Sequence, residues 1–455
     1  MAHPTELDAL YAFLAAAVVT ALLTPLTMRF ARGVGAIDEP RERGLSERPT
    51  PLLGGLAIFA GALAAGLIWL PAGYAREHQP ELWHGVLLGA AVITVVGALD
   101  DRFDLHPAGK LLGQGLAAVI VVHYGVAVKA ITLPFAGRLF FPNTGPADAG
   151  PVLTVVGLVV MMNVVNFSDG VDGLTAGVCA IIAAAMAVIA FNLGRPEPGV
   201  LAALTAGVAL GFLLYNFPPA SSFMGDCGAN LLGLLMGVIT VEAAVKTTAV
   251  VSFVLPLILL AIPFLDTTFV VLKRLKYRQP IYQSDSEHFH HRMARIGFSN
   301  RRTIAYLYAW TLMLAGLALA LRFVPYSDHH GHLRTGWTLV MIALGLLAVA
   351  ASVYLVYVLE ILKFRRLDAS RLRRLRPDAS AAEIERDVAR DFETGEMDAV
   401  SAEVEPAAPN AVFQRVAGDV GRAEQAIGQR QVDQQRVGAE DERGSAQTPI
   451  ATDRG

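Results

Sequence analysis

The chain has too little cysteine for a disulfide framework or a zinc site, because only two of its 455 residues, Cys179 and Cys227, are of this type. The simpler interpretation is that both cysteines are small residues that pack between helices.

The sequence also lacks an excess of basic residues, since 37 Lys and Arg stand against 40 Asp and Glu. A formal net charge of −3 gives no sign of a nucleic-acid-binding surface. No internal repeat is evident.

The first apolar segment lacks the features of a cleaved signal peptide. No basic stretch precedes it, and the acidic residues Glu6 and Asp8 stand at its start. We therefore expect this segment to remain as a helix.

Apolar residues, by contrast, are abundant: they form 54% of the chain and give a mean hydropathy of +0.48. A helix that crosses a bilayer needs about 20 mainly apolar residues. Eleven apolar blocks are present, at about 8–28, 53–71, 85–99, 108–128, 151–167, 174–193, 199–216, 228–245, 249–272, 304–323 and 337–362. So many long blocks do not suit a soluble core. The sequence predicts an all-α polytopic integral membrane protein with about 11 transmembrane helices.

Basic residues are divided unevenly between alternate loops. The segments after the first, ninth and eleventh blocks are rich in Lys and Arg, whereas the loops on the opposite side are poor in them. Cytoplasmic loops carry an excess of basic residues, so we expect the N-terminus outside and the C-terminus in the cytoplasm. The longest outer loop, 129–150, is expected to contain a short hairpin.

Two domains are expected from the change in composition near residue 366. Residues 1–366 would form the transmembrane domain. Residues 367–455 would form a cytoplasmic, largely disordered polar tail, with one polar helix over 378–393.

Four acidic clusters each lie at the end of an apolar block. They are Asp100 with Asp101 and Asp104, the segment 163–172, Phe223 with Asp226, and Asp266. By the expected orientation, all four lie on the cytoplasmic side. Carboxylates are costly in a bilayer and are kept there mainly for ion or substrate chemistry. The pattern therefore predicts an active site built around a divalent cation.

The Asp100–Asp101 pair favours a hard cation, because adjacent carboxylates repel unless a cation lies between them and Mg²⁺ prefers oxygen ligands. Solvated residues at a helix end are the alternative. Phe223 beside Asp226 suits an aromatic platform next to a metal ligand, although packing at the membrane interface would also explain it.

The segment from Asn163 to Asp172 places two amides on one helical face and two carboxylates in a glycine-rich turn. Asn pairs in a membrane segment favour a role in binding a polar ligand or orienting a carboxylate. Asp172 is alternatively the N-cap of the next helix. The loop with His288, His290, His291 and Arg292 suits phosphate or sugar contacts better than zinc, because no cysteine lies nearby. A solvated basic loop is the alternative.

Together these motifs resemble those of the polyprenyl-phosphate N-acetylhexosamine-1-phosphate transferase family, in the same order over about residues 8–362. The resemblance implies transfer of a sugar 1-phosphate from a UDP-sugar to a lipid phosphate, with UMP leaving. It also implies a requirement for Mg²⁺, with Mn²⁺ as an alternative ion. Homodimers occur in the family.

The resemblance also implies roles for particular residues. Asp100, Asp101 and Asp226 would be catalytic, and Asp226, Asp101 and Asn166 would bind the metal ion. Phe223 would stack on uracil, and Lys110 would lie near the phosphates. The full set expected to bind substrate is Lys110, Asn163, Asn166, Asp169, Asp172, Asn216, Phe223, His288, His290, His291 and Arg292.

The predicted activity is transfer of GlcNAc-1-phosphate from UDP-GlcNAc to a polyprenyl phosphate at the cytoplasmic face of a bacterial plasma membrane. Its products would be polyprenyl-diphosphate-GlcNAc and UMP, in the first lipid-linked step of a cell-envelope polysaccharide. Asp104 favours this branch, since the phospho-MurNAc-pentapeptide translocases typically carry Lys there. The alternatives are another UDP-sugar, such as UDP-MurNAc-pentapeptide, and a cation-coupled transporter. Transporter sites, however, lie near the bilayer midplane.

Overall fold

The computed structural model describes residues 4–39, 49–70, 81–133, 137–141, 145, 148–244, 300–325 and 334–357, together with Ser380 and Glu383. The chain divides into two compact units, Met1–Asp368 and Ala369–Gly455. In the second unit, the backbone N–H of Ser380 donates to Glu383 Oε2 at 2.9 Å, and the N–H of Glu383 donates to Ser380 Oγ at 3.3 Å. This reciprocal pair is a capping box, which lies within the predicted polar helix at 378–393.

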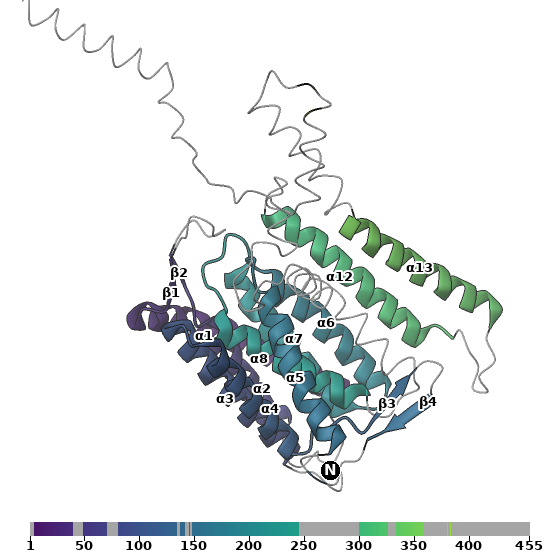
Figure 1. Cartoon of the computed structure of the whole chain (residues 1–455), viewed down its shortest axis with the longest axis horizontal. Helices are drawn as coiled ribbons and strands as arrows, with labels where there is room; N and C mark the ends of the chain where they lie inside the picture. The colour runs from purple at the N-terminus through teal and green to yellow at the C-terminus, as the bar shows by residue number, and fades with distance from the viewer. Residues whose placement is uncertain are drawn as a thin grey trace, which may run out of the picture. The chain divides into compact units, whose positions relative to one another are not determined.

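The described part of the first unit is mainly helical (Figure 1). Its helices are α1 (Glu6–Val34), α2 (Gly54–Trp69), α3 (Leu82–Phe103), α4 (Pro107–His123), α5 (Ala149–Ser168), α6 (Leu174–Asn192), α7 (Pro196–Asn216), α8 (Gly225–Ala244), α12 (Asn300–Phe323) and α13 (Thr335–Tyr357). Eight of them are long and apolar enough to cross a membrane, and α2 and α4 are shorter apolar helices. Each corresponds to a predicted block. The remaining block, 249–272, lies outside the described residues, so the total of eleven stays a prediction.

Two short antiparallel strand pairs join the helices. The predicted hairpin is confirmed as β3 (Ala130–Leu133) and β4 (Gly137–Phe140), in which Ala130 is paired with Phe140. The second pair, β1 (Ile37–Asp38) and β2 (Thr50–Pro51), was not predicted. Strands of two residues are too short to show an alternating pattern.

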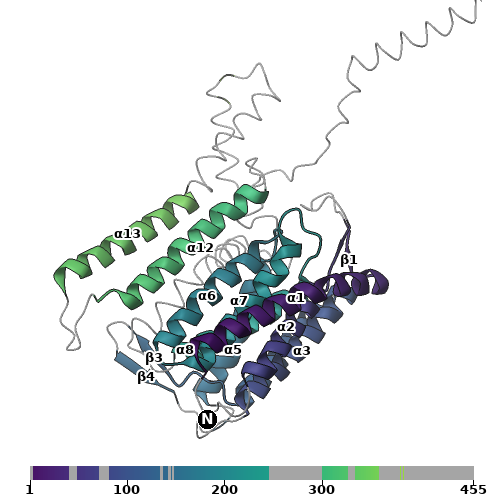
Figure 2. The same cartoon turned by 180° about the vertical axis from the view of Figure 1, so that it is seen from behind.

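The helices pack around α7 and α8. α1 packs against α7 and α2, and α6 packs against α7 and α12 (Figures 1 and 2). The apolar side chains of α8 are almost completely buried, as in Leu231 and Leu232. α12 also packs against α13.

Four helices form the group that carries most of the predicted site. α3 packs against α4 and α8, and α5 packs against α4 and α8. α3 ends where Asp104 adopts a left-handed φ of 50°, so Asp100 and Asp101 lie in its last turn. α8 begins beside them at Gly225. This junction brings three of the four acidic clusters toward one end of the bundle, and Asp266 lies outside the described residues.

Candidate active site

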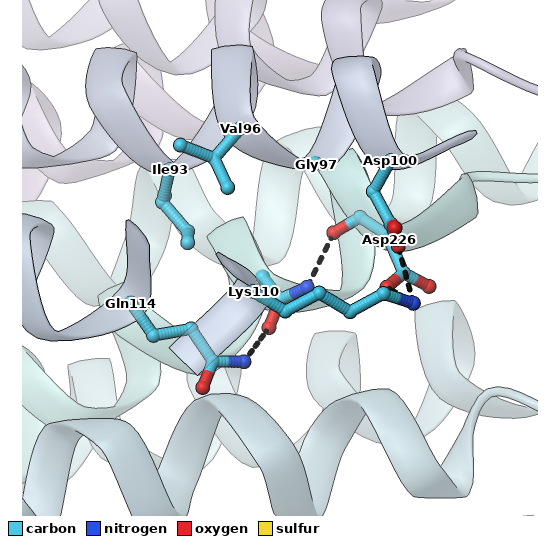
Figure 3. A pocket seen from close by; sticks show the side chains of 8 residues that line it. Ile93, Val96, Gly97, Asp100, Lys110, Gln114 and Asp226 are labelled. Carbon is cyan, nitrogen blue, oxygen red and sulfur yellow. Dashed lines mark hydrogen bonds and ion pairs between the residues drawn. The ribbon is translucent and has the colours of Figure 1, made fainter. Parts of the chain in front are cut away.

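The centre of the site is an ion-pair cluster between three helices. Lys110 Nζ, in the first turn of α4, lies 2.5 Å from Asp100 Oδ2 and 3.2 Å from Asp226 Oδ2 (Figure 3). The other oxygen of Asp100 accepts the backbone N–H of Leu105 at 2.8 Å. One ammonium group therefore offsets the charges of two carboxylates that come from sequence positions far apart.

Asp101 has different partners from its neighbour Asp100. Its Oδ1 accepts the backbone N–H of Asp226 at 2.7 Å, and its Oδ2 accepts the N–H of Cys227 at 3.3 Å. Both oxygens thus face the beginning of α8. The prediction that Asp101 binds the metal ion is not tested by these contacts and stays a prediction.

The amide of Asn166, near the end of α5, reaches the same cluster. Its Nδ2 donates to Asp226 Oδ2 at 3.3 Å. Asn163, one turn earlier, contacts the cluster only indirectly, because its Nδ2 donates to Gln114 Oε1 at 2.7 Å and to the carbonyl of Val159 at 2.8 Å.

A buried amide network adjoins the cluster, and two of its members, Gln114 and Asn230, were not among the predicted site residues. Gln114 Nε2 donates to Asn230 Oδ1 at 2.8 Å, and Asn230 Nδ2 donates to the carbonyl of Asp226 at 2.8 Å. With Asn163 on the far side of Gln114, the network links α4, α5 and α8. The signal was present in the sequence, since Gln114 interrupts an apolar block in the same way as Asn163 does.

The second predicted group, around the α5–α6 turn, is built on Asn216 at the end of α7. Its Oδ1 accepts the N–H of Gly173 at 2.9 Å, and its Nδ2 donates to the carbonyl of Ser222 at 3.0 Å. Asp172 does not cap α6: its Oδ2 accepts the N–H of Ala220 at 2.9 Å, and the N-cap of α6 is Gly173. Asn216 and Asp172 therefore hold the α5–α6 turn against the α7–α8 loop.

Helix α12 contacts both the α5–α6 turn and the α7–α8 loop. The hydroxyl of Tyr308 donates to the carbonyl of Gly173, and Arg301 Nε donates to the carbonyl of Pro218 at 3.1 Å.

Burial raises the pKa of Asp169, in the α5–α6 turn, to about 7, and the nearby carboxylate of Asp226 acts in the same direction. Burial also raises the pKa of Asp172, against the effect of the N–H from Ala220.

Phe223 lies just before α8 and is half-buried. Its backbone N–H donates to the carbonyl of Pro51 at 3.0 Å, and its carbonyl accepts the N–H of Gly54 at 3.0 Å. The last residue of β2 and the first residue of α2 thus hold the Phe223 backbone in place. The predicted residues His288, His290, His291 and Arg292 lie outside the described residues.

A small pocket, with room for about one water molecule, opens between the apolar and polar parts of the site. It is lined by Ile93, Val96, Gly97, Asp100, Lys110, Gln114, Asp226 and Asn230 (Figure 3). Within the described residues, no group of three or more His, Cys, Asp or Glu side chains is arranged to hold a metal ion. Such a group is not required for Mg²⁺, which often uses one or two carboxylates together with substrate phosphates and water.

The family model described as glycosyl transferase family 4 matches residues 83–244, which contain the cluster, the amide network and the Asn216 contacts. The relatives include the probable undecaprenyl-phosphate N-acetylglucosaminyl 1-phosphate transferase of Bacillus subtilis, 33% identical over 315 residues, which are 68% of this chain and 84% of the relative.

Two further relatives have related names. The decaprenyl-phosphate N-acetylglucosaminephosphotransferase of Mycobacterium leprae is 34% identical over 69% of this chain and 83% of its own length. The undecaprenyl-phosphate alpha-N-acetylglucosaminyl 1-phosphate transferase of Salmonella typhi is 27% identical over 75% and 89%. With matches over most of the relatives' length, a matching family model and eight helices that could cross a membrane, this chain is a multi-pass membrane protein and belongs to glycosyl transferase family 4.

Proposed function

We propose that this protein transfers GlcNAc-1-phosphate from UDP-GlcNAc to a polyprenyl phosphate, giving polyprenyl-diphosphate-GlcNAc and UMP. The observation that carries the proposal is the cluster of Asp100, Lys110, Asn166 and Asp226, which four helices build at one end of an apolar bundle. The names of the relatives support the same sugar and the same class of lipid. The lipid acceptor and the polar donor would meet at the membrane edge, on the cytoplasmic face of a bacterial plasma membrane.

The donor groups of the cluster fit a Mg²⁺ ion. Asp226 Oδ2 already has two N–H donors beside it, Lys110 Nζ at 3.2 Å and Asn166 Nδ2 at 3.3 Å. The position of the ammonium group shows that the carboxylates favour a positive charge at this point. The Asn166 side chain also carries an oxygen, which would ligate a cation after rotation of the amide. Asp226 and Asn166 would hold the ion, which would offset the charge of two phosphates that must approach each other.

The chain's own residues supply the other tasks. Lys110 would contact a phosphate oxygen, since an ammonium group beside two carboxylates keeps its positive charge and lies next to the pocket. Asp100 would orient the lipid phosphate or accept its proton, because one of its oxygens lies beside Lys110. Phe223 would stack on uracil from the loop before α8, and His288, His290, His291 and Arg292 would contact the sugar phosphate.

The test is UMP release by the purified full-length protein with polyprenyl phosphate and UDP-GlcNAc. We expect release that requires both the lipid and Mg²⁺. Release only with another UDP-sugar, such as UDP-MurNAc-pentapeptide, would assign the chain to a different donor. No release with any UDP-sugar, from protein that is folded and monodisperse, would refute the proposed reaction.

A further inference from the structure

The adjacent residues Asp100 and Asp101 accept hydrogen bonds from different donor groups. Asp100 is paired with Lys110 and with the N–H of Leu105, both outside α8. The carboxylate oxygens of Asp101 accept two backbone N–H groups at the beginning of α8, those of Asp226 and Cys227, and the Cys227 thiol also lies beside this carboxylate. Two carboxylates that look equivalent in the sequence therefore accept hydrogen bonds from different donors, and Asp101 is the one that accepts the backbone N–H groups of α8.

The contacts of Asp101 are those of an N-terminal helix cap, but the cap comes from another helix. The first N–H groups of a helix have no partner within it, and a side-chain oxygen normally satisfies one of them. Met224, which precedes α8, has no side-chain oxygen. The carboxylate of Asp101 satisfies two of these N–H groups from the last turn of α3, where the helix dipole of α8 also favours its negative charge.

Two glycines allow this close approach. A Cβ atom on Gly225 would collide with Oδ2 of Asp101, and Gly225 also has a φ of +66°, which L side chains rarely adopt. A Cβ atom on Gly97 of α3 would collide with the Cα of Cys227. The end of α3 and the beginning of α8 are thus in backbone contact around Asp101.

The consequence falls on Asp226, whose backbone and side chain are fixed by separate groups. Its N–H is held by Asp101 at 2.7 Å, and its Oδ2 lies beside Lys110 and Asn166. We propose that Asp101 is a positioning residue: it caps α8 from α3 and so sets where the carboxylate of Asp226 lies. This inference rests on the proposed function only in taking Asp226 as the metal-binding carboxylate.

The effect of Asp101→Asn distinguishes a positioning role for Asp101 from a role as metal ligand or proton acceptor. An asparagine caps a helix about as well as an aspartate, whereas alanine does not. An asparagine at position 101 has one accepting oxygen, which can keep the 2.7 Å bond from the Asp226 N–H but not the 3.3 Å bond from the Cys227 N–H as well. Asp101→Asn should therefore keep most of the positioning, and Asp101→Ala should lose it. A base would instead lose its role in both variants, because both remove the negative charge, and a metal-binding carboxylate would bind the ion more weakly in both.

The first readout is amide hydrogen exchange of the full-length protein, followed in peptides that cover residues 223–230. Asp101→Ala should speed exchange there by about tenfold or more, and Asp101→Asn by much less. Asp100→Asn is the matched control, since it changes the neighbouring carboxylate without touching the N–H groups of α8, and it should leave this exchange unchanged.

The second readout is Mn²⁺ affinity, measured by electron paramagnetic resonance without substrate. Loss of a residue that orients a ligand typically weakens metal binding by about 10- to 100-fold, so we expect about tenfold for Asp101→Ala and a change of less than about threefold for Asp101→Asn. If Asp101→Asn weakens Mn²⁺ binding as much as Asp226→Asn does, with the α8 amides still protected, Asp101 is a ligand and the proposal is wrong.

Failure of the proposed function would look different. A wild-type protein that neither binds Mn²⁺ nor releases UMP would refute the transferase assignment, while the exchange data would still report on the cap. If Asp101→Ala does not fold, the amide exchange and Mn²⁺ affinity of Asp101→Asn and Asp100→Asn still test the positioning role. Fast exchange at the start of α8 in Asp100→Asn but not in Asp101→Asn would contradict the positioning role.

Discussion

Helices α8 and α13 are both long enough to cross a membrane, yet they have opposite surroundings. In the most apolar part of each helix, 78% of α8 is buried inside the protein, compared with 11% of α13. α8 carries Asp226, Asn230 and Glu242, whereas α13 has no acidic or basic residue. The less apolar helix is therefore the buried one. In a bilayer, lipid accepts apolar side chains as readily as a protein interior does, so burial follows polar groups and close packing.

The largest expected effect comes from Asp226, the acidic residue in the first turn of α8. Asp226→Asn keeps the size of the side chain and removes its charge at the point where Lys110 and Asn166 meet it. We expect UMP release to fall by at least about a hundredfold, because charge stabilisation is a dominant part of such catalysis. Thermal unfolding in detergent checks that the variant is folded, and full activity in a folded variant would refute the assignment of Asp226 as metal ligand.

The next effect concerns packing, and a glycine on each helix gives a matched pair. A Cβ atom on Gly233 of α8 would lie 2.6 Å from the Cα of Met162 in α5, whereas none of the described residues comes within 4 Å of a Cβ atom on Gly345 of α13. Gly233→Leu should therefore destabilise the protein by about 3 kcal/mol or more, and Gly345→Leu by less than about 0.5 kcal/mol. Unfolding midpoints measure the difference, and equal midpoints would contradict the contrast.

A smaller effect is expected for the amide network beside α8. Gln114→Leu removes the hydrogen bonds to Asn163 and Asn230 and leaves their buried polar groups without this partner. We expect a loss of about 1–2 kcal/mol in the free energy of unfolding, together with reduced turnover. Unchanged stability with unchanged UMP release would show that the network does not support the site.

The corresponding polar contact on α13 should matter least for function. Trp310 Nε1 of α12 donates to Ser352 Oγ of α13 at 2.8 Å. Hydrogen bonds between membrane helices contribute about 0.6 kcal/mol on average, so Ser352→Ala should change stability by about that amount. UMP release should equal that of the wild type, and a large loss would mean that α13 acts on the site.

Deletion of residues 370–455 should leave UMP release unchanged. The reason is that the predicted site residues all lie within Met1–Asp368, the first compact unit of the chain. The measurement is the same lipid-dependent assay on the truncated protein, and an inactive but folded truncation would assign the tail a role in catalysis.

The sequence alone predicted the positions of the helices well. A long apolar block in a membrane must satisfy its backbone hydrogen bonds internally, and a helix does this. It also predicted that the carboxylates of α3 and α8 would lie at one end of the bundle, which the contacts of Lys110 and Asp101 confirm. It did not predict which partner each aspartate takes. That choice depends on how each helix is rotated, and the rotation is set by packing at residues such as Gly97 and Gly225.

Other features escaped prediction for local reasons. Gln114 and Asn230 were single amides in apolar surroundings, and their pairing joins positions more than a hundred residues apart. Asn216 was expected to bind substrate, and the structure places both ends of its amide on backbone groups of neighbouring turns. Its predicted role stays a prediction.

The ion pairs of Lys110 have a consequence for how the protein is made. Two carboxylates brought together at the edge of a bilayer would oppose assembly of the helices unless a positive charge arrived with them. Lys110 is part of the same polypeptide and contacts both, so the counter-charge arrives with α4 as the bundle assembles. The chain therefore carries, within its own fold, a positive charge that offsets the repulsion between these two carboxylates.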